Sequence, residues 1–340
     1  MAKCILLKAM RDGRIAHAYL FLGLQGTGKL TTALEFGKTL NCESPTDIGS
    51  CGKCAVCMWI EHGNFPDMRV WSPKGQDTTI DSMREMRDLA SFRPARGKWV
   101  VNIIEQGDTL NEDSANCILK LLEEPPEYVV NILLYRNAAS VLPTIRSRCQ
   151  LVRFHQVSAE ELAGHLVKDY GASPQEAEVV SVYAQGRPGL AITLLDDKDF
   201  AQNRETVSMV AEKAGQGNIW QALGLAEALR KGDSSDTTDD SDEKDTKFAS
   251  SAKGTRETTN ESLEMLLVWY RDLLATKLMG DNAIIVNSDK RHILQDQAAR
   301  YPHAGPLLLR IGEIQQARQR LRGNANPQMV TELLMMRLAL

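Results

Sequence analysis

A glycine-rich segment near the N-terminus has the spacing of a phosphate-binding loop. An apolar run over 18–22 precedes it and helix-forming sequence follows it. The glycines allow a tight turn, the helix would direct free N–H groups at an anion, and its lysine would contact the terminal phosphates. The predicted contact residues are Gly23, Gly26, Thr27, Gly28 and Lys29. In the pattern G-x-x-x-x-G-K-[ST] the last residue supplies a hydroxyl to Mg²⁺, and Leu30 stands there instead. The alternative is a glycine turn that binds nothing.

A second candidate site follows the buried apolar run over 99–104, where Glu105 and Gln106 come next. A nucleotide hydrolase places carboxylates there, which hold Mg²⁺ and polarise the attacking water. Gln106 occupies the position of the water-activating acid, so this site also departs from the catalytic pattern.

Four cysteines form a C-x8-C-x2-C-x2-C array at Cys42, Cys51, Cys54 and Cys57. Thiolates at this spacing suit a closed, tetrahedral, structural Zn²⁺ site. Four protein ligands leave no position for a catalytic water, so we predict a structural metal. The alternative is four unrelated buried thiols.

Length and composition exclude several classes of protein. The chain has 340 residues, which suggests two or three domains. It contains no apolar stretch long enough for a membrane span and no secretory signal, so a cytoplasmic location is predicted. The formal net charge is −4, and the segment 231–247 alone carries seven acids against three lysines. The remainder is nearly neutral, which argues against tight, independent DNA binding.

Alternating strands and helices predict the fold that positions these residues. Strands are expected over 18–22, 68–71, 99–104, 129–134 and 151–154. Helices are expected over 4–12, 30–40 and 79–92, the last introduced by Asp77 or Thr78, and from Asn111 to the stop at Pro125-Pro126. This order predicts an α/β domain over 1–156, with a parallel, helix-covered sheet and a nucleotide site at the strands' carboxyl ends.

The rest of the chain predicts helices alone. A capping box at Ser158–Glu161, a start at Ser173-Pro174 and a helix over 188–195 outline a small helical domain, 157–197. An all-helical domain is expected over 198–340. It is interrupted by a polar, acidic segment, 231–260, which is predicted to be a disordered loop. A regulatory tail is the alternative for that loop.

Several stretches together resemble the clamp-loader subunits of bacterial DNA polymerase III, and most of all their delta-prime branch. The matching stretches are His17–Gly23, Gly26–Lys29, the four cysteines after the first long helix, Asn116–Pro126 and Arg146–Cys149. They lie within residues 14–195.

The resemblance implies an AAA+ architecture: a nucleotide-binding domain, a three-helix lid and a helical collar through which five subunits assemble. Gamma and tau subunits of this family hydrolyse ATP to open the sliding clamp and place it on primed DNA. Delta-prime subunits are stators with little or no ATPase activity. The implied partners are gamma/tau and delta subunits, the sliding clamp, and primed DNA through the complex.

The resemblance also implies a role for Arg148, the arginine of the Ser-Arg-Cys motif, as an arginine finger. It would reach in trans into a neighbouring subunit's ATP site, since the strand over 151–154 follows it directly and places it at the rim of the sheet. The alternative is that Arg148 pairs with a carboxylate of its own chain.

Further departures from the ATPase pattern all argue against ATP hydrolysis by this chain. Tyr135-Arg136 stands where a small hydroxylated sensor is usual, and Gly189 stands where the lid's sensor arginine is expected, with Arg187 adjacent. We therefore expect no ATP turnover by this chain, which would act as a subunit of a nucleotidyltransferase holoenzyme; ATP binding stays open.

Two other functions compete with the stator. One is an active gamma/tau-like ATPase. The other is a free-standing zinc module that binds nucleic acid, which is disfavoured because the cysteine cluster carries only Lys53 and Trp59 as basic and aromatic residues.

Overall fold

The computed structural model describes residues 2–73, 80–214, 219–231, 244–323 and 325–339. These residues form two compact units. The first consists of Met1–Ser158 with Gln185–Leu190, and the second of Ala159–Ala184 with Ala191–Leu340. No helix of the described residues has the length and apolar character needed to cross a membrane.

The first unit is built on a five-stranded parallel sheet, as the sequence predicts. Its strands are β1 (Ala18–Leu22), β2 (Met68–Trp71), β3 (Val100–Ile104), β4 (Val129–Tyr135) and β5 (Gln150–Arg153). Their order is β2-β3-β4-β1-β5, and every neighbouring pair is parallel. The carboxyl ends of β1, β3 and β4 therefore lie at one edge, and that edge carries the glycine-rich loop.

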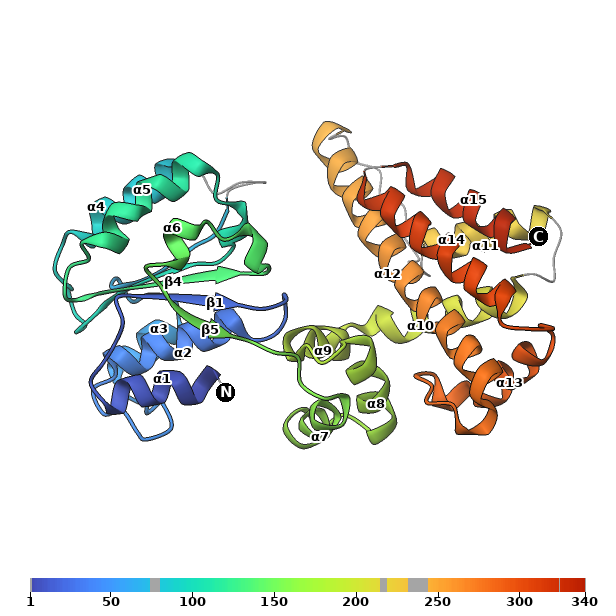
Figure 1. Cartoon of the computed structure of the whole chain (residues 1–340), viewed down its shortest axis with the longest axis horizontal. Helices are drawn as coiled ribbons and strands as arrows, with labels where there is room; N and C mark the ends of the chain where they lie inside the picture. The colour runs from blue at the N-terminus through green and yellow to red at the C-terminus, as the bar shows by residue number, and fades with distance from the viewer. Residues whose placement is uncertain (1, 74–79, 215–218, 232–243, 324, 340) are drawn as a thin grey trace. The chain divides into compact units, whose positions relative to one another are not determined.

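Helices cover both faces of the sheet (Figure 1). One face carries α4 (Ile80–Ala90), α5 (Glu112–Glu123) and α6 (Pro143–Arg146), and the other carries α1 (Ala2–Arg11), α2 (Lys29–Asn41) and α3 (Ala55–Glu61). Alternate residues of β1 face the two layers: Leu20 packs in the cluster with α4 and α5, whereas Tyr19 packs in the cluster with α1 and α2. Both faces are buried, and this accounts for the largely apolar strands.

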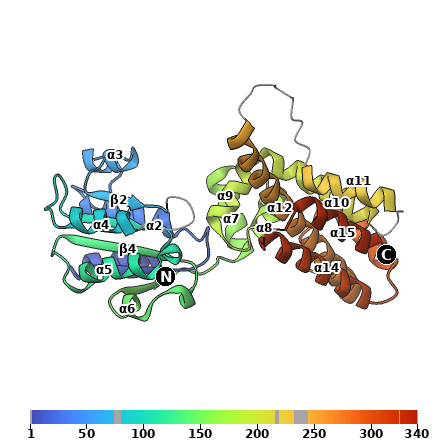
Figure 2. The same cartoon turned by 90° about the horizontal axis from the view of Figure 1, so that it is seen from above.

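The second unit contains helices alone, apart from short connecting turns, among its described residues. They are α7 (Ala159–Tyr170), α8 (Pro174–Tyr183), α9 (Pro188–Asp196), α10 (Lys198–Lys213), α11 (Ile219–Lys231), α12 (Lys244–Met279), α13 (Arg291–Ala299), α14 (Gly305–Arg322) and α15 (Pro327–Ala339). The first residues of α9 count with the first unit. Helices α11, α12, α14 and α15 pack side by side (Figures 1 and 2).

A buried carboxylate organises one part of the second unit. Asp272 of α12 is fully buried and accepts hydrogen bonds from the backbone N–H groups of Val286 (3.0 Å) and Asn287 (2.9 Å) and from the Asn287 side-chain amide (2.8 Å). The Asn287 side-chain oxygen in turn accepts from Arg204 of α10 at 3.0 Å and from the Tyr183 hydroxyl of α8 at 3.4 Å. One polar network therefore joins α8, α10 and α12.

Most predicted ends of strands and helices lie within two residues of the observed ends. Helix α4 begins at Ile80, and its expected start at Asp77 or Thr78 lies outside the described residues. The disordered loop predicted over 231–260 extends too far, because α12 already begins at Lys244. Residues 244–260 contain no proline, so the helix of the apolar segment that follows can continue backward through them. Residues 232–243 lie outside the description.

Candidate nucleotide site and metal centre

The glycine-rich loop joins β1 to α2 in the order that the sequence predicts. Gly26 and Gly28 both have φ of 82°, a left-handed conformation that side-chain-bearing residues rarely adopt. The Thr27 hydroxyl donates to the Leu24 carbonyl at 2.7 Å and so closes the turn. Helix α2 begins at Lys29, and its first N–H groups lie at the edge of the loop. The local geometry is that of an anion cradle.

Lys29, however, is engaged by its own loop. Its ammonium group donates to the backbone carbonyl of Leu24 at 2.8 Å and also to that of Gly23. The residue is only 9% exposed, and burial lowers the pKa of Lys29 against the attraction of Asp108. A phosphate group would have to compete with these two carbonyl oxygens for the lysine.

A cavity of about 230 Å³ opens beside the loop. Its lining brings together the residues predicted from separate segments: Gly26, Gly28, Lys29, Leu30, Glu105, Gln106, Arg136 and Gly189. The side chain at position 30 is apolar, so it supplies no oxygen ligand for Mg²⁺. Glu105 accepts a hydrogen bond from the Ser72 hydroxyl at 2.5 Å. The cavity therefore has the location of a nucleotide site without its usual metal ligands.

The backbone at Gly189 approaches the loop closely. Its N–H donates to the Gly26 carbonyl at 2.8 Å, and a Cβ at position 189 would lie 3.2 Å from that oxygen. A sensor arginine at 189 would need this contact to open. The structure thus explains why a residue without a side chain suits the position.

Asp108 lies in the segment after β3 where a nucleotide hydrolase would place carboxylates, and in the structure it bonds to the chain after β4. Its carboxylate accepts from the backbone N–H of Arg136 at 2.7 Å and from the Ser140 hydroxyl. It thereby fixes the chain just after β4, where Arg136 lines the cavity. The sequence shows an acid shortly after a buried strand. Its hydrogen-bond partners lie about thirty residues further along the chain, so the sequence does not predict these contacts.

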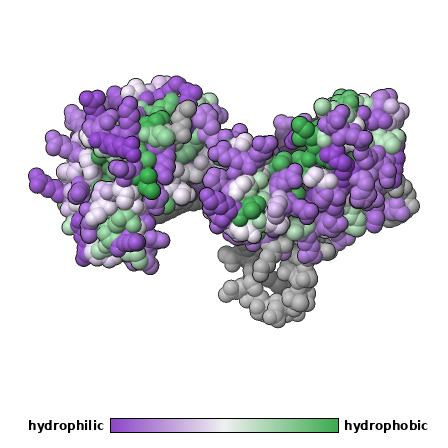
Figure 3. Space-filling model, turned by 90° about the horizontal axis from the view of Figure 1, so that it is seen from below, coloured by the Kyte–Doolittle hydropathy of each residue, from purple (hydrophilic) through white to green (hydrophobic). Residues whose placement is uncertain are grey.

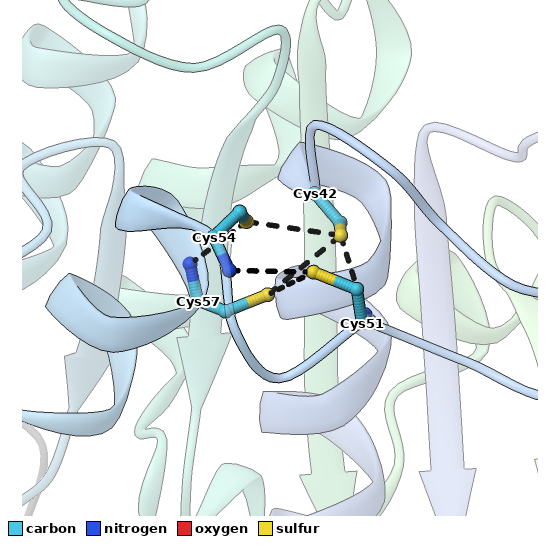
Figure 4. Close-up of side chains that lie close together, drawn as sticks. All are labelled: Cys42, Cys51, Cys54 and Cys57. Atoms are coloured by element: carbon cyan, nitrogen blue, oxygen red, sulfur yellow. Dashed lines mark hydrogen bonds between the residues drawn. The ribbon is translucent and has the colours of Figure 1, made fainter.

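The four predicted cysteines converge on one point (Figure 4). Cys42 follows α2, Cys51 lies in the connecting loop, and Cys54 and Cys57 lie at the start of α3. All four sulfur atoms lie within 4.8 Å of one another. Neighbouring Sγ atoms are 3.7 Å apart for Cys42 and Cys57 and 3.9 Å apart for Cys51 and Cys57. Zn–S bonds of about 2.3 Å in a tetrahedron hold the sulfurs about 3.8 Å apart, so the cluster can bind a metal of that geometry.

Backbone N–H groups point at the sulfurs, as a thiolate centre requires. The N–H of Cys54 lies 3.4 Å from the sulfur of Cys51, and that of Cys57 lies 3.4 Å from the sulfur of Cys54. Hydrogen bonds from the N–H groups of Lys53 and Cys54 lower the pKa of Cys51 to about 6. Burial raises the pKa of Cys57 to about 12. A bound cation would be needed to hold all four as thiolates at neutral pH.

We predict close to one zinc ion per chain, measured by elemental analysis of protein purified without chelator. Removing the metal should loosen residues 42–57, which have little apolar packing to order them, while the sheet stays folded. Hydrogen exchange should therefore rise in that segment and stay unchanged in β1, β3 and β4. Metal-free protein from such a purification would contradict the assignment.

Arg148 lies in the turn between α6 and β5. One end of its guanidinium contacts Glu123 of α5, with 2.6 Å between Nη2 and Oε1. The other end donates to the Thr144 carbonyl at 3.0 Å and to the Ser147 hydroxyl at 3.1 Å. The side chain is 34% exposed. The pairing within its own chain, the alternative raised by the sequence, is therefore present, and the guanidinium still reaches the surface.

The parallel sheet with a glycine-rich loop between β1 and α2 defines a P-loop fold. Residues 2–158 match the family described as DNA polymerase III, delta subunit. The chain is 27% identical to the delta-prime subunit of Bacillus subtilis DNA polymerase III over 341 residues, covering 98% of this chain and 94% of that one. These matches confirm the resemblance to the clamp-loader subunits of bacterial DNA polymerase III.

Other relatives are longer than this chain. The tau subunit of Bacillus subtilis is 32% identical over 196 residues, which is 56% of this chain and 35% of tau. The chain thus spans about a third of that relative. A gamma subunit-related protein from Thermotoga maritima has a solved structure with 17% identity and a TM-score of 0.44, over 99% of this chain and 98% of that one. At that score the likeness carries no functional information.

Proposed function

We propose that the chain is a delta-prime-like stator of the DNA polymerase III clamp loader, which helps to load the sliding clamp on primed DNA. The observation that carries the proposal is the cavity beside the glycine loop, where Lys29 is held by its own carbonyls and Leu30 and Gln106 replace the metal-binding and water-activating groups. The match to a delta-prime subunit along nearly the whole chain supports it.

The proposed domains follow from that function. Residues 1–156 form the nucleotide-binding-like domain with the zinc insertion at 42–57, residues 157–197 the lid, and residues 198–340 the collar. Apolar side chains exposed on α14 and α15 would be covered by neighbouring subunits: Leu308 (55% exposed), Leu309 (74%) and Met329 (71%). Figure 3 shows a largely hydrophilic face with separate hydrophobic areas on each unit. The proposed partners are gamma/tau and delta subunits, and the proposed location is the cytoplasm.

Within the complex, Arg148 would act on a neighbour's nucleotide. A planar cation beside the γ-phosphate stabilises the charge that develops during phosphoryl transfer. Its position next to the edge strand β5 and its partial exposure make such a contact across a subunit boundary feasible.

ATP hydrolysis by the isolated chain should be undetectable above background, because no hydroxyl at position 30 holds Mg²⁺ and no carboxylate at 106 activates water. A steady-state assay with wild type and Lys29→Ala tests this, and both should give the same baseline. Turnover by the wild type that Lys29→Ala abolishes would favour the alternative, an active gamma/tau-like ATPase. Co-purification tests whether the chain is a clamp-loader subunit: it should co-purify with gamma/tau and delta subunits.

A further inference from the structure

Helix α5 ends within the motif Leu-Leu-Glu-Glu-Pro-Pro at 121–126, and this end places one carboxylate of the motif next to Arg148. Pro125 and Pro126 cannot continue the helix, so Glu123 is its last residue and Glu124 its cap, with φ of −126°. Helix α5 packs beside α6, whose end leads to Arg148. The motif therefore delivers one carboxylate, that of Glu123, to the guanidinium.

The contacts of Arg148 come from two sides. Thr144 and Ser147, both close in sequence, accept from Nη1, while Glu123 accepts from Nη2 across the α5–α6 packing. A guanidinium has five N–H donors in a fixed plane. These three contacts leave donors for a phosphate, so the arginine can bind an anion without releasing Glu123.

We propose that Glu123 is a positioning residue for Arg148, fixing the plane of the guanidinium before a neighbouring subunit's nucleotide arrives. The inference rests on the proposed function of Arg148 in trans. Without Glu123, the long side chain keeps its two local contacts at Nη1 but loses the contact that restrains Nη2. Holding it in place lowers the entropy lost when it meets the phosphate.

The expected effect is moderate, because both side chains are partly exposed, 34% for Arg148 and 47% for Glu123. Exposed ion pairs are weak, so Glu123→Gln should lower kcat at the neighbour's site by about two- to fivefold. The KM for ATP should stay unchanged, since ground-state binding is made by the neighbour. Higher salt should lower the wild-type rate more than the variant's, because salt screens the pair.

The experiment uses the reconstituted complex with gamma/tau and delta subunits and measures DNA-stimulated ATP hydrolysis. Glu124→Gln is the matched control: it makes the same charge change one residue away, and no described contact joins Glu124 to Arg148. Glu123→Gln is also made in the Arg148→Ala background, where it should have no further effect. Size-exclusion chromatography should show unchanged assembly for every variant.

The outcomes distinguish the trans role of Arg148 from the positioning role of Glu123. If Arg148→Ala hydrolyses ATP at the wild-type rate, the trans role itself fails. If Arg148→Ala is impaired while Glu123→Gln equals Glu124→Gln, the positioning role fails and the trans role stands. A faster Glu123→Gln complex, or one that no longer assembles, would also overturn the positioning role, because the carboxylate would then restrain the arginine or support only the fold.

Discussion

In a reconstituted clamp loader, Arg148→Ala is expected to lower ATP hydrolysis at the neighbouring subunit's site by about 10³-fold or more, the usual contribution of an arginine finger supplied in trans. The chain itself should remain folded. Arg148 is partly exposed and its partners are a surface carboxylate and two groups of its own turn, so its removal leaves no unpaired charge in the core.

The loss in the whole complex should be partial, because gamma/tau subunits supply their own fingers to the other sites. DNA-stimulated hydrolysis and the rate of clamp loading are the two measurements. Arg146→Ala serves as the matched control, since Arg146 is exposed and ends α6 two residues before Arg148. Arg148→Lys should restore little, because an ammonium lacks the planar fork of a guanidinium. Clamp loading at the wild-type rate by an assembled Arg148→Ala complex would leave the residue with a structural role alone.

Asp272→Ala is expected to destabilise the second unit by about 3 kcal/mol, since an unsatisfied buried donor costs about 1–3 kcal/mol. The substitution leaves the N–H groups of Val286 and Asn287 and the Asn287 amide without their acceptor. Asn287 also accepts from Tyr183 and Arg204, so the change should loosen α8 and α10 as well.

Urea unfolding followed by tryptophan fluorescence measures this effect, because Trp269 lies buried on the same helix as Asp272. The control is Asp296→Ala, which removes an exposed acid from α13. A midpoint for Asp272→Ala equal to that of Asp296→Ala would mean that the network contributes nothing to stability. Asp272→Asn should lie between wild type and alanine, because one side-chain oxygen remains to accept.

Local sequence predicts the five strands and helices α1, α2, α4 and α5 of the first unit, whereas the short helices α3 and α6 were not predicted. The expected strand over 18–22 coincides with β1, and Asn111 caps α5 through Ser114 as predicted. These signals are local: apolar runs form buried strands, and a capping side chain bonds to an N–H three residues ahead. The loop predicted over 231–260 is too long, because α12 already begins at Lys244 and polar composition does not by itself stop a helix.

The residue types and their spacing identify the chemical groups of the site: four cysteines at metal spacing, a glycine loop without its hydroxyl, and a glutamine in place of an acid. The contacts of those groups follow from the fold. The engagement of Lys29 by the Gly23 and Leu24 carbonyls, the contact of Gly189 with Gly26, and the pair between Arg148 and Glu123 join groups whose positions depend on the packing of the sheet and helices. Spacing along the chain reports which groups are present, whereas a hydrogen bond depends on distance and angle in space.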